Sequence, residues 1–272
     1  MKARLLSCLA ILEEELGGLN NNMIYAVASQ KGGTGKTTTS ISLAAGLARH
    51  GKRVLLVDID SQANSSKVLL PRYQDLKGSQ TVCVTILNRQ PLQIHHTSNP
   101  HLDIVPSHIL LSNTDVELTT ALDHREARLK TELDKVKDNY DYVFIDCPPA
   151  LSWLTINAFT AADRVIIVVS PGYFELDSIV QISNTLHQVK EMFNSALELE
   201  GFLFTMSDPT ITTKTSLQVL RQTYTESVFN TVIPRNTDIR DSHMAQQDIF
   251  TYNSKSTSAE AYTRLIKEIF DL

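Results

Sequence analysis

The chain has 272 residues, of which 42% are hydrophobic and 20% are charged, so its composition is that of an ordinary globular protein and not of a disordered one. Its net charge of −5 argues against a protein that coats nucleic acid with its whole surface, but does not exclude a local basic patch. The three cysteines, Cys8, Cys83 and Cys147, are widely spaced and form no C-x-x-C pair. They suggest neither a disulfide framework nor a zinc site, and they fit a reducing cytoplasm.

Residues 1–22 are expected to form a short extension before the main domain, folded as an amphipathic helix that ends at Gly17 and Gly18. The acidic residues 13–15 interrupt its apolar run and no small-residue cleavage site follows, so we do not interpret it as a secretory signal. The same acidic residues argue against attachment to anionic lipid. The extension is far too short for a helix-turn-helix domain, and no stretch approaches the roughly 20 apolar residues of a membrane span.

Short apolar runs alternate with helix-like segments along the rest of the chain. Each run is continuously apolar, which is typical of strands that are buried on both faces of a parallel sheet. Strands are predicted at 24–29, 54–59, 102–107, 142–147, 165–170 and 202–207. Helices are predicted at 38–50, 112–138, 176–199 and 256–271, and Gly51 stands where the first of them would need a C-cap.

This alternation predicts a doubly wound α/β fold, with a mostly parallel sheet flanked by helices, in one domain from residue 23 to 272. Ligands of such folds bind outside the carboxyl ends of the strands. The chain shows no Pro/Gly/Ser-rich linker and no internal repeat.

The stretch 29-SQKGGTGKTTT-39 lies between the first predicted strand and the first predicted helix, where a phosphate-binding loop belongs. Its glycines, Gly32, Gly33 and Gly35, let backbone N–H groups turn toward an anion, and the helix N-terminus adds its positive dipole end. Lys36 brings a full charge to the outer phosphates, and the hydroxyl of Thr37 can coordinate Mg²⁺. A glycine turn that binds nothing is the alternative, and the flanking elements make it much the weaker one.

The segment 31-KGGTGKTT-38 resembles the deviant Walker A motif, K-G-G-x-G-K-[ST], of P-loop NTPases in the ParA/MinD family. That family includes the ParA/Soj partition ATPases, the division-site ATPase MinD and the nitrogenase iron protein. The resemblance covers nearly the whole chain from residue 23. Further motifs similar to those of partition ATPases are 57-VDIDSQANSS-66, 141-DYVFIDCPPALS-152 and 233-IPRNTDIRDS-242.

The resemblance implies an ATPase that uses ATP and Mg²⁺ and pairs with a second copy of itself. Thr34 and Thr38 join the glycines, Lys36 and Thr37 in holding the nucleotide. In this family Lys36 serves its own nucleotide, while Lys31 reaches across the homodimer interface to the partner's phosphates. Two ATP molecules between subunits concentrate negative charge, which a lysine from each side can neutralise.

Three aspartates, Asp58, Asp60 and Asp146, follow apolar strands and should therefore meet at one edge of the sheet. A single aspartate at such a position is more often a helix N-cap, but three beside a phosphate loop favour a metal and hydrolysis site. The resemblance places Asp146 near Mg²⁺ as the Walker B and switch II residue, and gives Asp58 a supporting metal role. It implies that Asp60 orients the attacking water.

The resemblance also implies that the polar loop from Met206 to Asp208 and the residues Pro234, Arg235 and Asn236 border the adenine, mostly through backbone contacts. Three positions depart from the partition pattern. The segment 206-MSDPT-210 lacks the usual arginine, Ser61 replaces a proline, and Asp241 replaces a glutamate.

The family divides by what its ATP dimer binds. The C-terminal segment 261–272 has too few cations for the lipid-docking helix of MinD-type members, so no membrane attachment is expected there. Cys83 and Cys147 do not match the paired cysteines of an iron–sulfur protein. In the ParA/Soj branch, basic residues late in the chain bind DNA without sequence preference, and the candidates are Lys214, Arg221 and Arg240.

Residues 212–240 hold four basic and two acidic residues, so this local excess of positive charge also suits a merely solvated surface. The favoured interpretation is a cytoplasmic, nucleoid-associated partition ATPase stimulated by a ParB-like or cargo-adaptor partner. Its cargo is a plasmid, a chromosome region or a protein assembly. The alternative is a metabolic or scaffold NTPase of the same fold that does not act on DNA.

Overall fold

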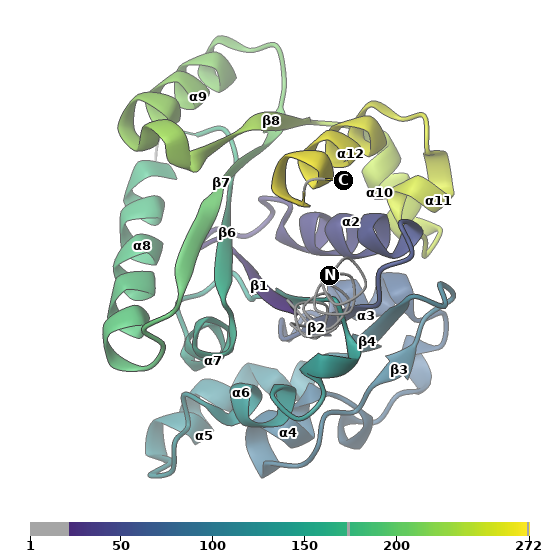
Figure 1. Ribbon diagram of the computed structural model, residues 1–272, viewed down its shortest axis with the longest axis vertical. Coiled ribbons are helices and arrows are strands. Elements are labelled where there is room, and N and C mark those ends of the chain that lie inside the picture. The colour runs from purple at the N-terminus through teal and green to yellow at the C-terminus, as the bar shows by residue number, and fades with distance from the viewer. Residues whose placement is uncertain (1–21, 173–174, 271) are drawn as a thin grey trace, which may run out of the picture.

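The computed structural model describes residues 22–172, 175–270 and 272, and the predicted N-terminal helix lies outside these residues. Its centre is an eight-stranded sheet in the order β3-β4-β2-β5-β1-β6-β7-β8 (Figure 1). All neighbouring strands run parallel except β3, which pairs antiparallel with β4. The strands are β1 (Met23–Ala28), β2 (Val54–Asp58), β3 (His95–His96), β4 (Leu102–Val105), β5 (Tyr142–Asp146), β6 (Arg164–Val169), β7 (Glu198–Ser207) and β8 (Val228–Pro234).

Helices cover both faces of this sheet, so the predicted doubly wound α/β fold is confirmed. The α-helices are α2 (Lys36–Arg49), α3 (Asn64–Leu69), α4 (Val82–Asn88), α5 (Thr114–Thr120), α6 (Arg128–Leu133), α7 (Trp153–Ala161), α8 (Glu175–Met192), α9 (Ile211–Tyr224), α10 (Thr237–Met244), α11 (Ile249–Asn253) and α12 (Thr257–Phe270). Short 3₁₀ turns are η1 (Tyr73–Asp75), η2 (Gly78–Gln80), η3 (Ile109–Asn113), η4 (Lys137–Asn139) and η5 (Thr225–Ser227).

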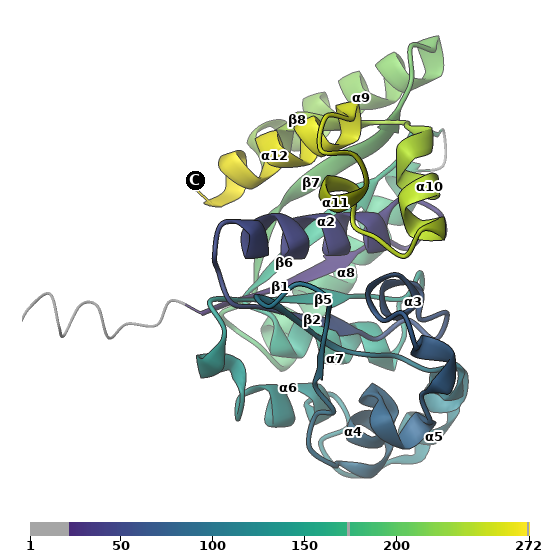
Figure 2. The ribbon, with the colours of Figure 1, turned by 90° about the vertical axis from the view of Figure 1, so that its right-hand side faces the viewer.

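Two apolar cores lie on opposite faces of the sheet. One contains buried side chains of α2, α11 and α12, and the other contains those of α4, α6, α7 and α8. Figure 1 shows α2 and α12 on one side of the strands and α7 and α8 on the other, and Figure 2 shows α10 and α11 beside α2. The central strands are buried along almost their whole length, as their continuous apolar runs predict.

The C-terminal helix α12 is strongly amphipathic, and its apolar face packs on the sheet. Tyr262, Leu265 and Ile266 are buried, and the ring of Phe270 contacts those of Tyr25 and Tyr142. Its apolar face is therefore occupied by the protein itself. Among the described residues, none of the helices combines the length and the apolar composition needed to cross a bilayer.

The predicted helix at 112–138 is wrong as a single element. Its first part forms η3 and α5, the chain then leaves the helical path, and α6 and η4 follow. The side chain of Asn157 on α7 holds this break, because it donates to the carbonyl of Arg125 at 2.7 Å and accepts from the N–H of Leu129 at 3.1 Å. The guanidinium of Arg125 also lies 4.0 Å from the ring centre of Trp153. These contacts with α7 replace the helix that local propensity favours.

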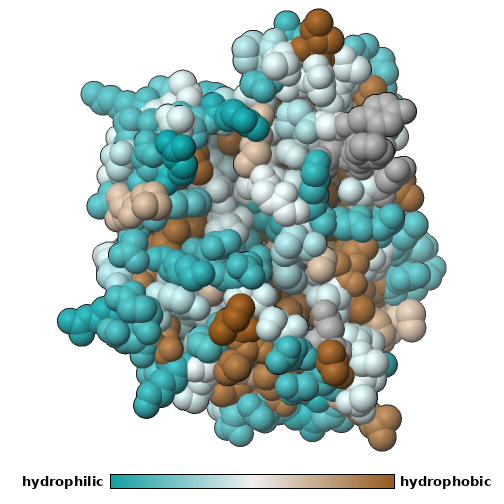
Figure 3. Space-filling model, turned by 180° about the vertical axis from the view of Figure 1, so that it is seen from behind, coloured by the Kyte–Doolittle hydropathy of each residue, from teal (hydrophilic) through white to brown (hydrophobic). Residues whose placement is uncertain are grey.

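The surface seen from behind is mostly polar, with apolar side chains gathered at its lower end, where α4, α5 and α6 lie (Figure 3). Four large apolar side chains are exposed in and around η3 and α5: Ile109, Leu110, Val116 and Leu122. An exposed apolar group of this kind is more typical of a contact surface than of a solvated one.

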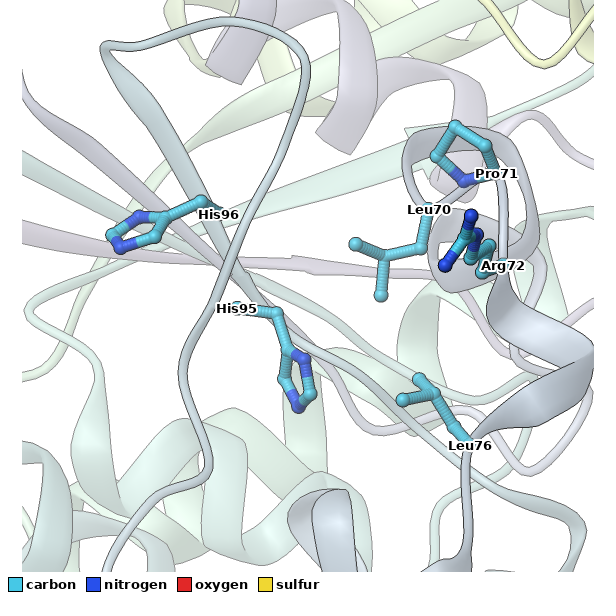
Figure 4. Close-up of a pocket in the computed structure, with 6 residues that line it drawn as sticks. All are labelled: Leu70, Pro71, Arg72, Leu76, His95 and His96. Atoms are coloured by element: carbon cyan, nitrogen blue, oxygen red, sulfur yellow. The ribbon is translucent and has the colours of Figure 1, made fainter.

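The chain that follows α3 packs against the edge strand β3. Between them lies a cavity of about 340 Å³, lined by Leu70, Pro71, Arg72, Leu76, His95 and His96. Figure 4 shows Leu70 and Leu76 opposite His95, whose ring nitrogen Nε2 lies 2.8 Å from the carbonyl oxygen of Gln80. The cavity leaves room beside the C-terminal end of α3.

Candidate nucleotide site

The glycine-rich loop between β1 and α2 needs glycine for its backbone conformation. Gly33 and Gly35 have φ angles of 74° and 92°, in the left-handed region that side-chain-bearing residues rarely adopt. A Cβ at Gly32 or Gly33 would meet no atom within 4 Å, so crowding by the protein is not the reason for glycine there. The loop is therefore open on that side, as a cradle for an anion must be.

Two hydrogen bonds fix the shape of this loop. The buried Thr34 accepts a hydrogen bond at its carbonyl from the Oγ1 of Thr205 on β7, at 2.6 Å. The Nζ of Lys36 donates to the carbonyl of Lys31 at 3.1 Å. Within the described chain, no side chain caps the N-terminus of α2 at Gly35. The backbone N–H groups of this helix end are thus available to a phosphate group.

The two lysines of the loop lie in different surroundings. Lys36 is only 6% exposed, whereas Lys31 is exposed to solvent. Burial lowers the pKa of Lys36, and the nearby carboxylates of Asp146 and Asp60 oppose that shift. One positive charge therefore points into the site and the other lies on its rim.

Asp58 and Asp146 are neighbours at the carboxyl ends of β2 and β5, where their Cα atoms are paired in register. Both side chains are fully buried. Asp146 accepts hydrogen bonds from the hydroxyls of Ser40 at 3.3 Å and Ser65 at 2.7 Å. Burial raises its pKa to about 6, although hydrogen bonds from Ser65 and Thr37 and the charge of Lys36 oppose the rise. Asp146 thus contacts Thr37 of the loop and lies near its Lys36, and a bound cation would favour its ionised form.

The carboxylate of Asp58 accepts hydrogen bonds from the loop and the helix that follow β2. Its Oδ2 accepts from the N–H and the hydroxyl of Ser66, at 2.9 and 2.7 Å, and its Oδ1 accepts from the N–H of Asp60 at 3.1 Å. Burial and the charge of Asp146 raise its pKa well above the usual range. Asp58 thus holds the loop that follows β2, and its metal role stays a prediction.

Asp60 is the most exposed of the three aspartates, although it too is buried. Its side chain is 7% exposed, and its Oδ1 accepts from the N–H of Gln62 at 2.9 Å. It is close enough to Lys36 to raise the pKa of that lysine. The structure therefore brings all three predicted aspartates to one edge of the sheet, beside the phosphate loop.

The predicted base-binding residues are also brought together. Ser207 and Pro234 pair at the ends of β7 and β8, and the N–H of Arg235 donates to the carbonyl of Ser207 at 2.9 Å. Met206, the last residue but one of β7, has a φ of 51°. Asn236 caps α10 by accepting from the N–H of Asp238 at 2.8 Å. Because Thr205 donates a hydrogen bond to Thr34, the strand β7, which ends beside the predicted base site, also contacts the phosphate loop.

The hydroxyl residues Ser40, Ser65, Ser66 and Thr205 were not predicted from the sequence. Ser65 and Ser66 stand inside the quoted segment 57–66, so their position shortly after Asp58 and Asp60 was an available signal. Ser40 lies one turn after Lys36 on α2, on the side that faces Asp146. No local pattern links Thr205 to Thr34, because the two are separated by 171 residues.

The donor set fits a nucleotide with Mg²⁺. The loop amides and Lys36 can hold phosphates, and the Thr37 hydroxyl and Asp146 lie together where a cation would bridge to them. Among the described residues no group of three His, Cys, Asp or Glu side chains could hold a metal ion alone. A cation at this edge therefore needs further oxygen ligands from the nucleotide and water, as Mg²⁺ sites in NTPases do.

The DNA-binding candidates fall into two places. Lys214 and Arg221 are seven residues apart on α9 and line one depression of about 400 Å³ with Leu217, Gln218 and Gln222. Arg240 lies on α10, which Figure 1 shows well away from α9, and it contacts its neighbour Asp241 at 3.4 Å. The three cations therefore do not form one patch on a single copy of the chain.

Comparison with known proteins adds the family to this geometry. The sporulation initiation inhibitor protein Soj of Bacillus subtilis is 41% identical over 251 residues, which cover 90% of this chain and 97% of that protein. The chain belongs to the Soj/ParA family. The chromosome-partitioning ATPase Soj of Treponema pallidum is 38% identical, covering 89% of this chain and 94% of its own. A family model described as AAA domain matches residues 22–199.

A solved structure of cobyrinic acid a,c-diamide synthase from Mycobacterium smegmatis, with bound ADP and magnesium, has the same fold. Its TM-score is 0.76 at 30% identity, and the match covers 90% of this chain and 93% of that one. Together with the Soj relatives, it confirms that this Soj/ParA protein is an ATPase that uses ATP and Mg²⁺. The roles of individual residues at the site stay predictions.

Proposed function

We propose that this protein is a partition ATPase whose ATP-bound form pairs with a second copy and binds DNA without sequence preference. Hydrolysis, slow alone and stimulated by a ParB-like or cargo-adaptor partner, releases the DNA and so moves a cargo. The observation that carries this proposal is the pair of lysines in one loop. Lys36 is buried beside the carboxylates, while Lys31 is exposed on the rim.

Pairing through the nucleotide edge is supported by charge and by surface. An exposed lysine on the phosphate loop can reach the phosphates of a second copy, whereas a buried one cannot. Ile109 and Leu110 are 56% and 52% exposed and begin η3, which three residues separate from β4, whose carboxyl end lies at the same edge. Exposed apolar side chains and an exposed lysine at one edge of the sheet suit a protein interface better than open solvent.

DNA binding is supported by α9 more than by α10. Lys214 and Arg221 face the same depression, so two copies of the chain would present four such cations. The guanidinium of Arg221 also donates to the carbonyl of Asn230 at 3.3 Å, which holds it against the edge strand. A few contacts with DNA phosphates are enough for weak, salt-sensitive binding. A protein with a negative net charge can therefore bind DNA weakly through a local group of cations. Such binding would associate the protein with the nucleoid.

A second candidate function is a metabolic or scaffold NTPase that does not act on DNA. The observation that favours it is the likeness to the cobyrinic acid a,c-diamide synthase structure at 30% identity. On this alternative, nucleotide turnover drives chemistry on a small ligand or cluster delivery, and α9 is a solvated surface.

Binding to random-sequence duplex DNA at low salt distinguishes the two. The Asp60→Ala protein with ATP is expected to bind more DNA than wild type, because blocked hydrolysis should trap the DNA-competent dimer. The affinity for DNA should fall steeply as salt is added, because binding is driven by the release of counterions from the DNA phosphates. No binding by Asp60→Ala with ATP, under conditions where it binds ATP, would favour the metabolic alternative.

A further inference from the structure

Five residues separate β2 from the short helix α3, which carries two consecutive serines, Ser65 and Ser66, whose side chains are both fully buried. Each hydroxyl donates to a different carboxylate. The Oγ of Ser65 lies 2.7 Å from Asp146, and the Oγ of Ser66 lies 2.7 Å from Asp58. Neighbouring residues of one helix thus contact the ends of two strands, β5 and β2.

Ser66 is connected to Asp60 by way of the Asp58 carboxylate. The Asp58 carboxylate accepts from Ser66 at one end of the connecting loop and from the N–H of Asp60 at the other. The Ser66 hydroxyl also accepts from the N–H of Ser107, beyond the end of β4, at 2.9 Å. One buried hydroxyl therefore joins β2, α3 and the chain after β4, and through the Asp58 carboxylate it is connected to the backbone of Asp60.

The loop between them has little freedom once these bonds are made. The N–H of Ala63 donates to the carbonyl of Asp60 at 2.8 Å, and Ala63 adopts a φ of 53° in the left-handed region. A residue with a Cβ adopts that conformation only where its surroundings hold it. Release of Ser66 would let the turn relax and move the Asp60 carboxylate.

The contact of Ser65 concerns Asp146 alone. Asp146 has one oxygen 3.3 Å from the hydroxyl of Ser40 and the other 2.7 Å from that of Ser65, so α2 and α3 fix its orientation from two sides. Groups that orient a metal-site carboxylate in this way set its affinity for the ion. The hydroxyl of Thr37, the predicted Mg²⁺ ligand, contacts the same carboxylate.

We propose that Ser65 and Ser66 are positioning residues with separate tasks: Ser65 orients Asp146 for Mg²⁺, and Ser66, through Asp58, holds Asp60 for hydrolysis. The proposal rests on the proposed roles of Asp146 and Asp60. A cavity lined by Leu70 and Leu76 lies at the other end of α3 (Figure 4).

The test compares Ser65→Ala and Ser66→Ala in the full chain by three measurements: thermal unfolding without nucleotide, the Mg²⁺ dependence of ADP binding, and kcat and KM for ATP. Ser65→Ala is expected to raise the Mg²⁺ concentration for half-maximal ADP binding about tenfold, with kcat little changed at saturating Mg²⁺. Ser66→Ala is expected to lower kcat about tenfold at unchanged KM and unchanged Mg²⁺ dependence.

Ser242→Ala is the matched control, because Ser242 is equally buried and its hydroxyl donates to the carbonyl of Ile239 on α10, away from the carboxylates. In the Asp58→Asn protein, adding Ser66→Ala should lower kcat far less than Ser66→Ala lowers it in the wild-type protein. The reason is that both substitutions break the same connection, from Ser66 through Asp58 to Asp60. Equal effects of the two serine variants on Mg²⁺ dependence and on kcat would overturn the division of tasks. Asp60→Ala is measured in parallel: wild-type hydrolysis by that variant would remove the Asp60 assignment itself, whatever Ser66→Ala does.

Discussion

Lys31 and Lys36 stand five residues apart in one loop, and their surroundings differ sharply. Lys36 is buried, its pKa is lowered by burial, and Asp146 and Asp60 lie near enough to oppose that shift. Lys31 is exposed, and its backbone carbonyl accepts a hydrogen bond from Lys36. Removing the side chain of Lys31 and removing that of Lys36 should therefore have different consequences.

Lys36→Ala should abolish measurable nucleotide binding. The substitution removes the buried cation that faces the phosphates, together with its bond to the loop carbonyl of Lys31, so the loop loses both charge and shape. Titration calorimetry with ATP and ADP measures the effect. An affinity close to that of wild type would remove the phosphate assignment of this loop.

Lys31→Ala should leave nucleotide binding by the monomer intact and impair what depends on the dimer. Because Lys31 is exposed on the rim, its loss should leave the buried part of the site in place. Sedimentation with ATP and the ATPase rate are the two measurements, with calorimetry on the monomer as the control. An unchanged sedimentation profile and an unchanged rate would contradict the cross-dimer role.

The carboxylates could be located from the sequence because strands in a parallel sheet end at one edge, which the pairing of Asp58 with Asp146 shows. The residues that donate hydrogen bonds to the site could not be located in this way. The bonds from Ser65 to Asp146 and from Thr205 to Thr34 join residues 81 and 171 positions apart, and buried serines and threonines have no pattern of their own. Side-chain hydrogen bonds of this range are set by the tertiary fold.

At the scale of elements, the six predicted strands are present, and two were missed. The strand β3 has only two residues, and in β8 the polar residues Asn230 and Thr231 interrupt the continuous apolar run that marks the central strands. The segment 112–138 is broken because Asn157 and Trp153 of α7 bind its middle. Those contacts come from another helix, so local periodicity could not reveal them.

The edge strand β8 is held by the C-terminal helix through Glu268. Its carboxylate accepts from the N–H groups of Asn230 at 2.6 Å and Thr231 at 2.9 Å. Burial favours the neutral form of this carboxyl, but the hydrogen bonds from Thr231 and Asn230 outweigh it and hold its pKa below the usual value. The ionised form is thus the one that stabilises the fold.

Glu268→Gln should lower the free energy of unfolding at pH 7 by about 1 kcal/mol, which is less than the usual value for bonds to a charged group because solvent screens this exposed side chain. The stabilisation is present above the ordinary glutamate pKa of about 4.3 and is lost as the pH falls through the lower pKa of the folded protein. Urea unfolding between pH 7 and 3 measures it, with Glu117→Gln on α5 as the control. Equal losses at pH 7 and pH 3 would contradict this account.

At the scale of the whole molecule, one strand connects the nucleotide site to the proposed DNA surface. Thr205 of β7 binds the phosphate loop, Met206 and Ser207 border the predicted base site, and α9 begins at Ile211. The carboxylate of Asp208 accepts from the hydroxyls of Thr210 and Thr213, both at 2.6 Å, which fixes the start of α9. Five residues thus separate the contact with the phosphate loop at Thr205 from the helix that carries Lys214 and Arg221.

The most direct test of the central claim is the retention of the wild-type protein on random-sequence DNA with ATP, with ADP and without nucleotide, at one low salt concentration. An ATP-driven dimer that carries cations on α9 predicts retention with ATP and little with ADP or with no nucleotide. Equal retention in all three conditions would contradict a nucleotide-controlled DNA switch.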